Sequence, residues 1–176
     1  IRFEGHYFDR FLRGSKRTKA RRLGLAHPKA GRVKNPRAQS KRWDLLDRAI
    51  AIDRTAALSS CSWGLGQVMG FNHKLAGYDT VQEFVLAMID DEEMQLEASV
   101  NFILNTKLDD ELRSMTTDPE TCRPFAKGYN GGNYRINNYH VKLAESLGKW
   151  QRIKDTPWTP DSEDKSRPDP VEDDSP

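Results

Sequence analysis

Apolar residues recur at helical spacing along most of this chain, and that spacing constrains the fold more than any other feature. The period is clear in residues 40–58, 81–89, 96–105 and 139–150. Charged residues fill most of the other positions in 40–58, as in a helix with one buried face. No stretch shows the strict alternation of apolar and polar residues that a half-buried strand requires. The pattern predicts a mainly α single domain with little or no β structure.

Local signals predict several helix boundaries. Thr80-Val81-Gln82-Glu83 has the order of a capping box and predicts that a helix starts there. A short helix is predicted over 109–115. Asp118 followed by Pro119 predicts another helix start, leading towards Phe125.

Two segments depart from the helical pattern. Residues 13–37 are rich in Lys, Arg and Gly and predict a long, partly irregular basic excursion. Residues 155–176 hold eight acids, two bases and five prolines, and predict a disordered tail. We therefore expect one folded domain over 1–154 and an acidic tail over 155–176. The opening residues 1–4 look like the end of an element already under way, so we expect an upstream segment or module.

Charge is divided unevenly along the chain. Residues 1–54 carry 16 Lys and Arg against 5 Asp and Glu, whereas the remainder carries 12 against 21. A cationic front favours polyanions such as nucleic acid, lipopolysaccharide or the acidic polymers of a cell wall. No Phe, Tyr or Trp lies in 13–42, which argues against base stacking on single strands but leaves non-specific duplex binding open.

The sequence predicts neither a metal site nor a membrane span. Cys61 and Cys122 lack C-x-x-C spacing and a histidine at zinc-finger distance, and whether they pair is open. No apolar run approaches the roughly 18 residues of a membrane span. We expect a soluble monomer that needs no cofactor.

Glu4 is the first candidate for chemistry. It stands in Phe3-Glu4-Gly5, with Tyr7 and Phe8 close behind. Desolvation by aromatic neighbours favours the protonated form of a carboxyl group, which a general acid needs in order to protonate a glycosidic oxygen. The alternative is a solvated glutamate, or one that is salt-bridged to a nearby arginine.

Two loop motifs are the next candidates. Gly64-Leu65-Gly66-Gln67 predicts a turn where a polymer can approach the backbone, followed by an amide able to bind a sugar hydroxyl or N-acetyl group. Tyr129-Asn130-Gly131-Gly132 offers a phenol, an amide and a flexible turn. Taken singly, each motif also fits an ordinary loop between helices.

The order of these motifs resembles a known group of proteins. A helix-end glutamate, a G-L-x-Q turn, a helix containing Asn101-Phe102-Ile103, and Y-N-x-G before a last helix resemble goose-type lysozymes and soluble lytic transglycosylases. The longer motifs at 2–8, 62–70 and 128–131 are more similar to the N-acetylmuramidase family found in endolysins of phages that infect Gram-negative bacteria. The resemblance covers about residues 1–150.

This resemblance implies a lysozyme-like α domain that cleaves the β-1,4 bond between N-acetylmuramic acid and N-acetylglucosamine in peptidoglycan. Glu4 matches the catalytic acid of the family. The substrate-binding residues that the resemblance implies are Ser62, Gly66, Gln67, Tyr129 and Asn130. Family members often carry an amino-terminal peptidoglycan-binding module.

A second carboxylate would decide the reaction. An inverting hydrolase needs a base that activates water, whereas a lytic transglycosylase lets the muramic 6-hydroxyl attack and gives an anhydro product. Asp44, Asp47 and Asp53 are the candidates ahead of the glycine turn. Asp53 is preferred because it lies near the helix end that leads into that turn.

The sequence leaves other functions open. The basic stretch 13–42 could bind anionic outer-membrane or wall polymers, or nucleic acid without sequence specificity. The same muramidase domain could also be a secreted antibacterial effector. As a phage endolysin, it would be made in the host cytoplasm without a signal peptide in this chain and would act on periplasmic peptidoglycan.

Overall fold

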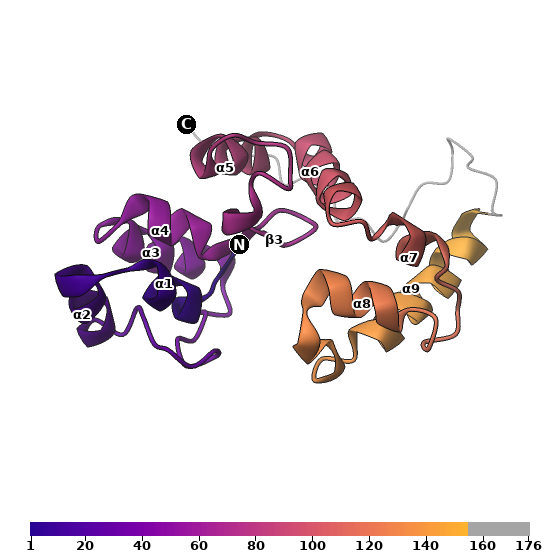
Figure 1. Ribbon diagram of the computed structural model, residues 1–176, viewed down its shortest axis with the longest axis horizontal. Helices are drawn as coiled ribbons and strands as arrows, with labels where there is room; N and C mark the ends of the chain where they lie inside the picture. The colour runs from indigo at the N-terminus through magenta and orange to yellow at the C-terminus, as the bar shows by residue number, and fades with distance from the viewer. Residues whose placement is uncertain (155–176) are drawn as a thin grey trace, which may run out of the picture. The chain divides into compact units, whose positions relative to one another are not determined.

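The computed structural model describes residues 1–154, which form two compact units, Ile1–Arg113 and a second unit that begins at Ser114. Helices dominate both units, and the β structure of the described residues is limited to three short strands (Figure 1). The predicted mainly α fold is therefore confirmed. The division into units does not test the predicted domain limit at 154, and the predicted tail, 155–176, lies outside the described residues.

A small antiparallel sheet belongs to the first unit. Its strands are β1 (Arg2–Phe3), β2 (Cys61–Trp63) and β3 (Val68–Met69), in the order β1-β2-β3. Arg2 pairs with Ser62, and Ser62 pairs in turn with Met69. Strands of two or three residues are too short to show a period of two, so the alternation rule could not find them. The sheet joins the start of the chain to the glycine turn.

Helices make up most of the first unit. They are α1 (Gly5–Phe11), α2 (Gly14–Arg22), α3 (Gln39–Ile50), α4 (Arg54–Ser59), the 3-10 helix η1 (Gly70–Asn72), α5 (Val81–Asp90), α6 (Glu92–Asn105) and α7 (Asp109–Arg113). Both α1 and α3 pack on α4, and α5 packs on α4 and on α6 (Figure 1). The short helix α4 is therefore central to the packing of this unit.

Large aromatic side chains fill the core around the sheet. Phe3 and Phe8 are fully buried and meet edge to face, with ring centroids 5.4 Å apart. The Trp63 indole N–H donates to the Leu58 carbonyl at 3.0 Å, and Trp43 meets its ring edge-on at 5.9 Å. Full burial of one such side chain contributes about 1.5–3 kcal/mol. This packing fixes β1 and β2 against the helices.

The helix start predicted at Thr80 is confirmed. Thr80 Oγ1 accepts from the Glu83 N–H at 3.2 Å, and Glu83 Oε2 accepts from the Thr80 N–H at 3.0 Å. This capping box satisfies backbone N–H groups that the first turn of a helix leaves unpaired. The apolar stripe that follows is buried at Val81, Phe84 and Met88.

The basic and amphipathic stretches between β1 and β2 differ from their predictions. The single helix expected over 40–58 is two helices, because Asp53 caps α4 and its Oδ1 accepts from the Ala56 N–H at 3.0 Å. The excursion at 13–37 contains the regular helix α2, whose Ala20 is buried and whose Arg21 pairs with Asp9. Tertiary contacts therefore order part of a segment that composition alone marked as irregular.

The second unit consists of α8 (Arg123–Asn130), η2 (Gly132–Arg135) and α9 (Tyr139–Lys154), and α8 packs on both of the others (Figure 1). The helix predicted from Asp118 begins later, since Asp118 Oδ1 accepts from the Glu120 N–H within a turn. Buried Tyr134 accepts from Arg135 Nε at 3.1 Å, and hydrogen bonds from Arg135 and Arg123 lower the pKa of its hydroxyl. The buried phenol therefore keeps polar partners.

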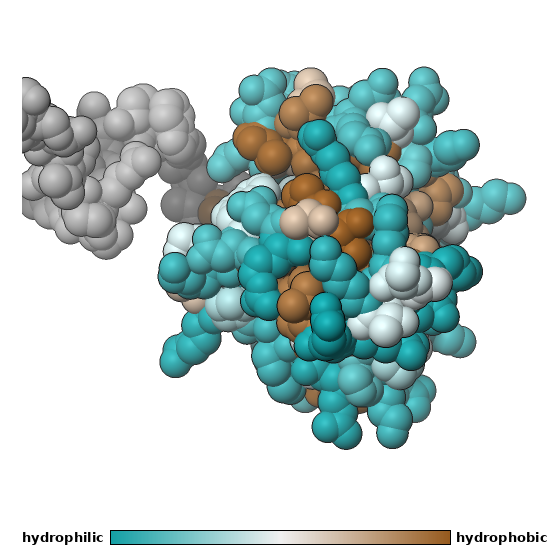
Figure 2. Space-filling model, turned by 90° about the vertical axis from the view of Figure 1, so that its left-hand side faces the viewer, coloured by the Kyte–Doolittle hydropathy of each residue, from teal (hydrophilic) through white to brown (hydrophobic). Residues whose placement is uncertain are grey.

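The surface on the side of α2 is mostly hydrophilic, with small apolar patches between the polar side chains (Figure 2). Within α2 itself, Ala20 is the one buried residue. No helix in residues 1–154 has both the length and the apolar composition needed to cross a bilayer.

Candidate active site

Glu4 lies where β1 passes into α1. Its N–H donates to the Ser60 carbonyl at 2.9 Å, which extends the pairing of β1 with β2 by one residue. Its carbonyl accepts from the N–H groups of Tyr7 and Phe8 at 3.0 and 3.2 Å, so Glu4 is the N-cap residue of α1. The resemblance described above placed Glu4 at the end of a helix, whereas in the structure it follows a strand and starts a helix.

The backbone beside Glu4 is held by a loop of the basic stretch. The Asn35 side chain accepts from the Phe3 N–H at 2.9 Å and donates to the Phe3 carbonyl at 2.7 Å, as a neighbouring strand would. Gly5 allows the same loop to come close, because a Cβ at this position would overlap the Val33 side chain. These contacts fix the direction in which the Glu4 side chain leaves the sheet.

The Glu4 carboxyl group has two basic neighbours. Arg2 Nε donates to Oε1 at 2.7 Å, and His6 Nδ1 lies 3.4 Å from Oε2. The Glu4 side chain is 20% exposed, whereas that of Arg2 is 61% exposed. The Glu4 carboxyl group is therefore salt-bridged in the free protein, and its partner is an exposed surface side chain that a ligand can reach.

Residues far apart in sequence share one face of the sheet. Residues i and i+2 of a strand point to the same face, and so do residues paired across antiparallel strands. Arg2 and Glu4 therefore lie on the face that carries Ser62. Ser62 Oγ donates to Gln67 Oε1 at 2.8 Å, which ties the glycine turn to this face. The structure thus places Glu4 and Ser62 on one face of the sheet and bonds Gln67 to Ser62, which is itself buried.

The glycine turn is a braced hairpin. Gln67 Nε2 donates to the Gly64 carbonyl at 2.9 Å, so both ends of its amide are bonded within the hairpin. Gly64 has a φ of 66°, a left-handed conformation that favours glycine. Gln95 of α6 accepts from the Leu65 N–H at 2.9 Å. Leu65, at the tip beside Gly66, is 69% exposed, and Gln67 is exposed as well, so a ligand can reach the turn.

Aromatic side chains line the start of α1. Phe8 is fully buried in the core. Tyr7 instead forms a partly exposed row with Phe11 and Phe71, whose ring centroids lie 6.3 and 4.8 Å from that of Tyr7. The His6 ring lies 4.2 Å from the Tyr7 ring and leads from this row to the acid. The Tyr7 and Phe11 rings are stacked, whereas Phe71 is inclined to both, so the row offers a partly exposed apolar surface for a sugar ring.

Asp53, the preferred second carboxylate, has structural partners. Lys16 Nζ lies 2.7 Å from Oδ2, and the hydrogen bonds from Lys16 and from the Ala56 N–H lower the pKa of Asp53. Because a helix rises about 1.5 Å per residue, α4 separates the Cα atoms of Asp53 and Ser60 by roughly 10 Å. Capping and pairing account for this carboxylate, and its catalytic role stays a prediction.

Tyr129 and Asn130 lie in the second unit, in the last turn of α8. The Tyr129 ring stacks on Phe125, with centroids 5.4 Å apart. Gly131 follows with a φ of 77° and ends the helix. Because these residues belong to a different unit from Glu4, their expected place beside the acid stays a prediction.

The two cysteines are buried free thiols, Cys61 in the first unit and Cys122 in the second. Burial raises the pKa of Cys61 to about 12, so its nucleophilic thiolate form is suppressed at neutral pH. Within residues 1–154, no three His, Cys, Asp or Glu side chains come together as metal ligands. Among the described residues, the candidate chemistry of the site therefore centres on the Glu4 carboxyl group.

Sequence reasoning allowed a salt bridge from Glu4 to a nearby arginine but did not identify Arg2, and it gave no role to Asn35. Arg2 and His6 stand two positions before and after Glu4, and they meet its carboxyl group only because a strand changes into a helix there. Two strand residues carry no periodic signal of that change. Asn35 is 32 positions away from Phe3, so no local pattern could indicate its contact.

Comparisons with known proteins agree with the motifs. The sequence model of the N-acetylmuramidase family matches residues 1–151. Among solved structures, the crystal structure of the Burkholderia AP3 phage endolysin is 34% identical, with a TM-score of 0.66. The match covers 85% of this chain, which spans 56% of the length of that endolysin. A search of curated proteins found no match. The chain belongs to the N-acetylmuramidase family.

Proposed function

We propose that this chain is a peptidoglycan hydrolase that cleaves the β-1,4 bond between N-acetylmuramic acid and N-acetylglucosamine. The observation that supports it most is the Glu4 carboxyl group, partly exposed at the end of β1 and on the sheet face of Ser62, which is hydrogen-bonded to Gln67. Membership of the N-acetylmuramidase family over residues 1–151 supports the same activity.

Glu4 acts in this proposal as the general acid. Its carboxyl proton passes to the glycosidic oxygen while the bond from that oxygen to C1 of N-acetylmuramic acid breaks, and the sugar ring takes on oxocarbenium character. The glycan has to displace Arg2 from Oε1 before this transfer can occur. Water then adds to C1 and gives up one proton to a base, which leaves a reducing N-acetylmuramic end, and the Glu4 carboxylate is reprotonated from solvent.

The glycan is proposed to run past the hairpin tip and the aromatic row of α1. Gly66 at the tip has no side chain, so a sugar can approach its backbone closely. Ser62 and Gln67 contribute mainly by holding the tip in shape through their hydrogen bond. We expect Tyr129 and Asn130 to supply a hydroxyl and an amide to the same glycan from the second unit.

A lytic transglycosylase is the second candidate. Asp53, the preferred water-activating base, is paired with Lys16 at 2.7 Å, which favours a reaction that needs no such base. In this reaction the muramic 6-hydroxyl attacks its own C1, and Glu4 takes back a proton from that hydroxyl after protonating the leaving oxygen. The product is a 1,6-anhydro sugar. Asp53 as a water-activating base belongs to the hydrolytic alternative and is the weaker of the two carboxylate proposals.

The proposed biology is host lysis by a monomeric phage endolysin acting on periplasmic peptidoglycan. The relative with the solved structure is a phage endolysin, which supports this setting. The basic stretch 13–42 would draw the protein to anionic outer-membrane or wall polymers. A secreted antibacterial effector would use the same activity in another setting, and non-specific nucleic-acid binding by 13–42 is the alternative without catalysis.

Mass spectrometry of the soluble products from purified peptidoglycan tests the proposal. Wild type is compared with Glu4→Gln and with Glu145→Gln, a control at an exposed glutamate of α9. We expect wild type and the control to release muropeptides. Glu4→Gln should lose at least about a hundredfold in rate, as for removal of a general acid, and keep the circular dichroism spectrum of the wild type.

The end groups separate the two reactions. Reducing N-acetylmuramic ends would support hydrolysis and make Asp53→Asn the next variant, whereas anhydro-muramic ends would support transglycosylation. Near-normal activity of Glu4→Gln would contradict the role of this residue. If wild type released no fragments, a binding function of the basic stretch 13–42 would be favoured over catalysis.

A further inference from the structure

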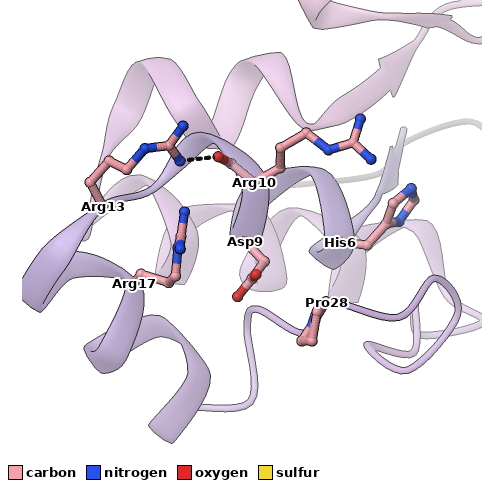
Figure 3. Close-up of a pocket in the computed structure, with 6 residues that line it drawn as sticks. All are labelled: His6, Asp9, Arg10, Arg13, Arg17 and Pro28. Carbon is pink, nitrogen blue, oxygen red and sulfur yellow. Dashed lines mark hydrogen bonds between the residues drawn. The ribbon is translucent and has the colours of Figure 1, made fainter.

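An open pocket lies on the first unit beside the candidate acid. It has a volume of about 470 Å³ and is lined by His6, Asp9, Arg10, Arg13, Arg17 and Pro28. Arg13 and Arg17 lie on one side of it and His6 and Pro28 on the other, with Asp9 between them (Figure 3). The proposed cleavage reaction uses none of its arginines.

The pocket carries a surplus of positive charge. Both Asp9 oxygens accept from Arg21, at 2.6 and 2.8 Å, and this pairing holds the pKa of Asp9 below its ordinary value. The one carboxylate of the pocket is thus paired with Arg21, which is outside the pocket lining, and Arg17 makes a smaller electrostatic contribution. Within residues 1–154, no carboxylate forms an ion pair with Arg10, Arg13 or Arg17. Three guanidinium groups therefore line the pocket with no ion-paired anion.

Backbone contacts hold two of these guanidinium groups in place. Arg13 Nη1 donates to the Leu12 carbonyl at 2.9 Å and also to the Arg10 carbonyl. Arg17 Nε donates to the same Leu12 carbonyl at 2.9 Å. A guanidinium group has five N–H donors in a planar fork, so each keeps donors for a ligand. Side chains that are already ordered lose less entropy when a ligand binds.

His6 connects the pocket to the candidate acid. Its Nδ1 is buried without a hydrogen-bond partner and lies 3.4 Å from Glu4 Oε2. His6, Asp9 and Arg10 all belong to α1, which starts directly after Glu4 and is about 10 Å long. About three extended peptide residues span that length. A ligand in the pocket can therefore belong to the same molecule as a glycan at Glu4.

We propose that this pocket binds a carboxylate of the peptide stem attached to N-acetylmuramic acid, an inference that rests on the proposed function. Planar guanidinium groups bind carboxylates through paired hydrogen bonds. The stem is acidic and starts on the sugar whose bond Glu4 cleaves, which favours it over the phosphates of lipopolysaccharide. The pocket makes peptide-bearing glycan the preferred substrate.

The test compares two forms of purified peptidoglycan, one native and one with its peptide carboxylates converted to amides. The rate of muropeptide release is measured on both for wild type, for Arg13→Gln/Arg17→Gln and for the control Lys74→Gln/Lys149→Gln. Both lysines are exposed and lie outside the basic stretch. Replacing them with glutamine removes two positive charges, as many as the arginine variant loses. We expect wild type and the control to favour the native form about tenfold, the strength of a charged hydrogen bond, and the arginine variant to favour neither.

The ratio of the two rates is internal to each sample, so partial unfolding of a variant cancels from it. Arg10→Gln provides a second variant in case the double variant does not fold, because its guanidinium only lies over the Tyr7 ring, 5.2 Å from the centroid. Arg10→Gln should lose part of the preference.

Each other outcome overturns one specific statement. An arginine variant that keeps the full preference overturns the pocket assignment, and so does a wild type with equal rates on both substrates. If the arginine variant kept its preference for the native substrate but no longer bound lipopolysaccharide vesicles, the pocket would be assigned to phosphate instead. Failure of wild type to cleave either substrate would contradict the proposed function itself.

Discussion

Asn35 holds both backbone polar groups of Phe3, one residue before Glu4, with hydrogen bonds of 2.9 and 2.7 Å. We expect Asn35→Ala to lower the free energy of unfolding by about 1–3 kcal/mol, since each hydrogen bond contributes about 1 kcal/mol. We also expect kcat for peptidoglycan cleavage to fall about tenfold with a smaller change in KM. A misplaced acid stabilises the transition state less well, whereas it changes glycan binding only slightly.

The matched control for Asn35 is Asn137→Ala, at an exposed asparagine of the second unit. Urea unfolding gives the stability of each variant, and initial rates on soluble glycan chains give kcat and KM. A less stable Asn35→Ala protein with wild-type kcat would mean that Asn35 supports the fold but does not position Glu4.

At the scale of single elements, the capping box of α5 offers a separate test. Removal of the Thr80 hydroxyl takes away the acceptor of the Glu83 N–H, a bond of 3.2 Å. Thr80→Ala should cost about 1 kcal/mol of stability, whereas Thr80→Ser keeps the acceptor and should stay close to wild type. Thermal unfolding followed by circular dichroism measures both. Equal melting temperatures for Thr80→Ala and Thr80→Ser would show that packing of the apolar stripe alone fixes the start of α5.

The same element explains what the sequence could predict. Thr80 and Glu83 are three positions apart, so one short window contains the whole signal for the start of α5. Asp53 is also a cap, yet the helical period continues past it, and its contact with Lys16 spans 37 positions. The sequence therefore predicted one helix where two exist. Glu4 was found by its motif, but its partner Arg2 depends on a strand of two residues.

The whole molecule divides the predicted site residues between its two units. The first unit contains Glu4, Asp53, Ser62, Gly66 and Gln67, and the second contains Tyr129 and Asn130. The predicted helix over 109–115 spans the division at Arg113, so the sequence pattern did not indicate a boundary there. The association of the units is thus a property to be measured on the whole chain.

Each unit carries one fully buried thiol, which makes its opening measurable. In Cys122→Ala only Cys61 can react with a thiol reagent, and in Cys61→Ala only Cys122 can react. Neither should react in the native state at pH 8, because burial excludes the reagent and also raises the pKa of Cys61 to about 12.

In rising urea, we expect Cys122 to be labelled at a lower concentration than Cys61. The second unit has roughly 40 described residues, and a unit of that size buries a smaller fraction of its surface than the larger first unit does. Urea unfolding of each variant, followed by circular dichroism, measures how much stability the cysteine substitution itself removes. Labelling of both thiols at one common urea concentration would contradict independent opening. The two units would then unfold as one, and residues of both would share a single cooperative structure.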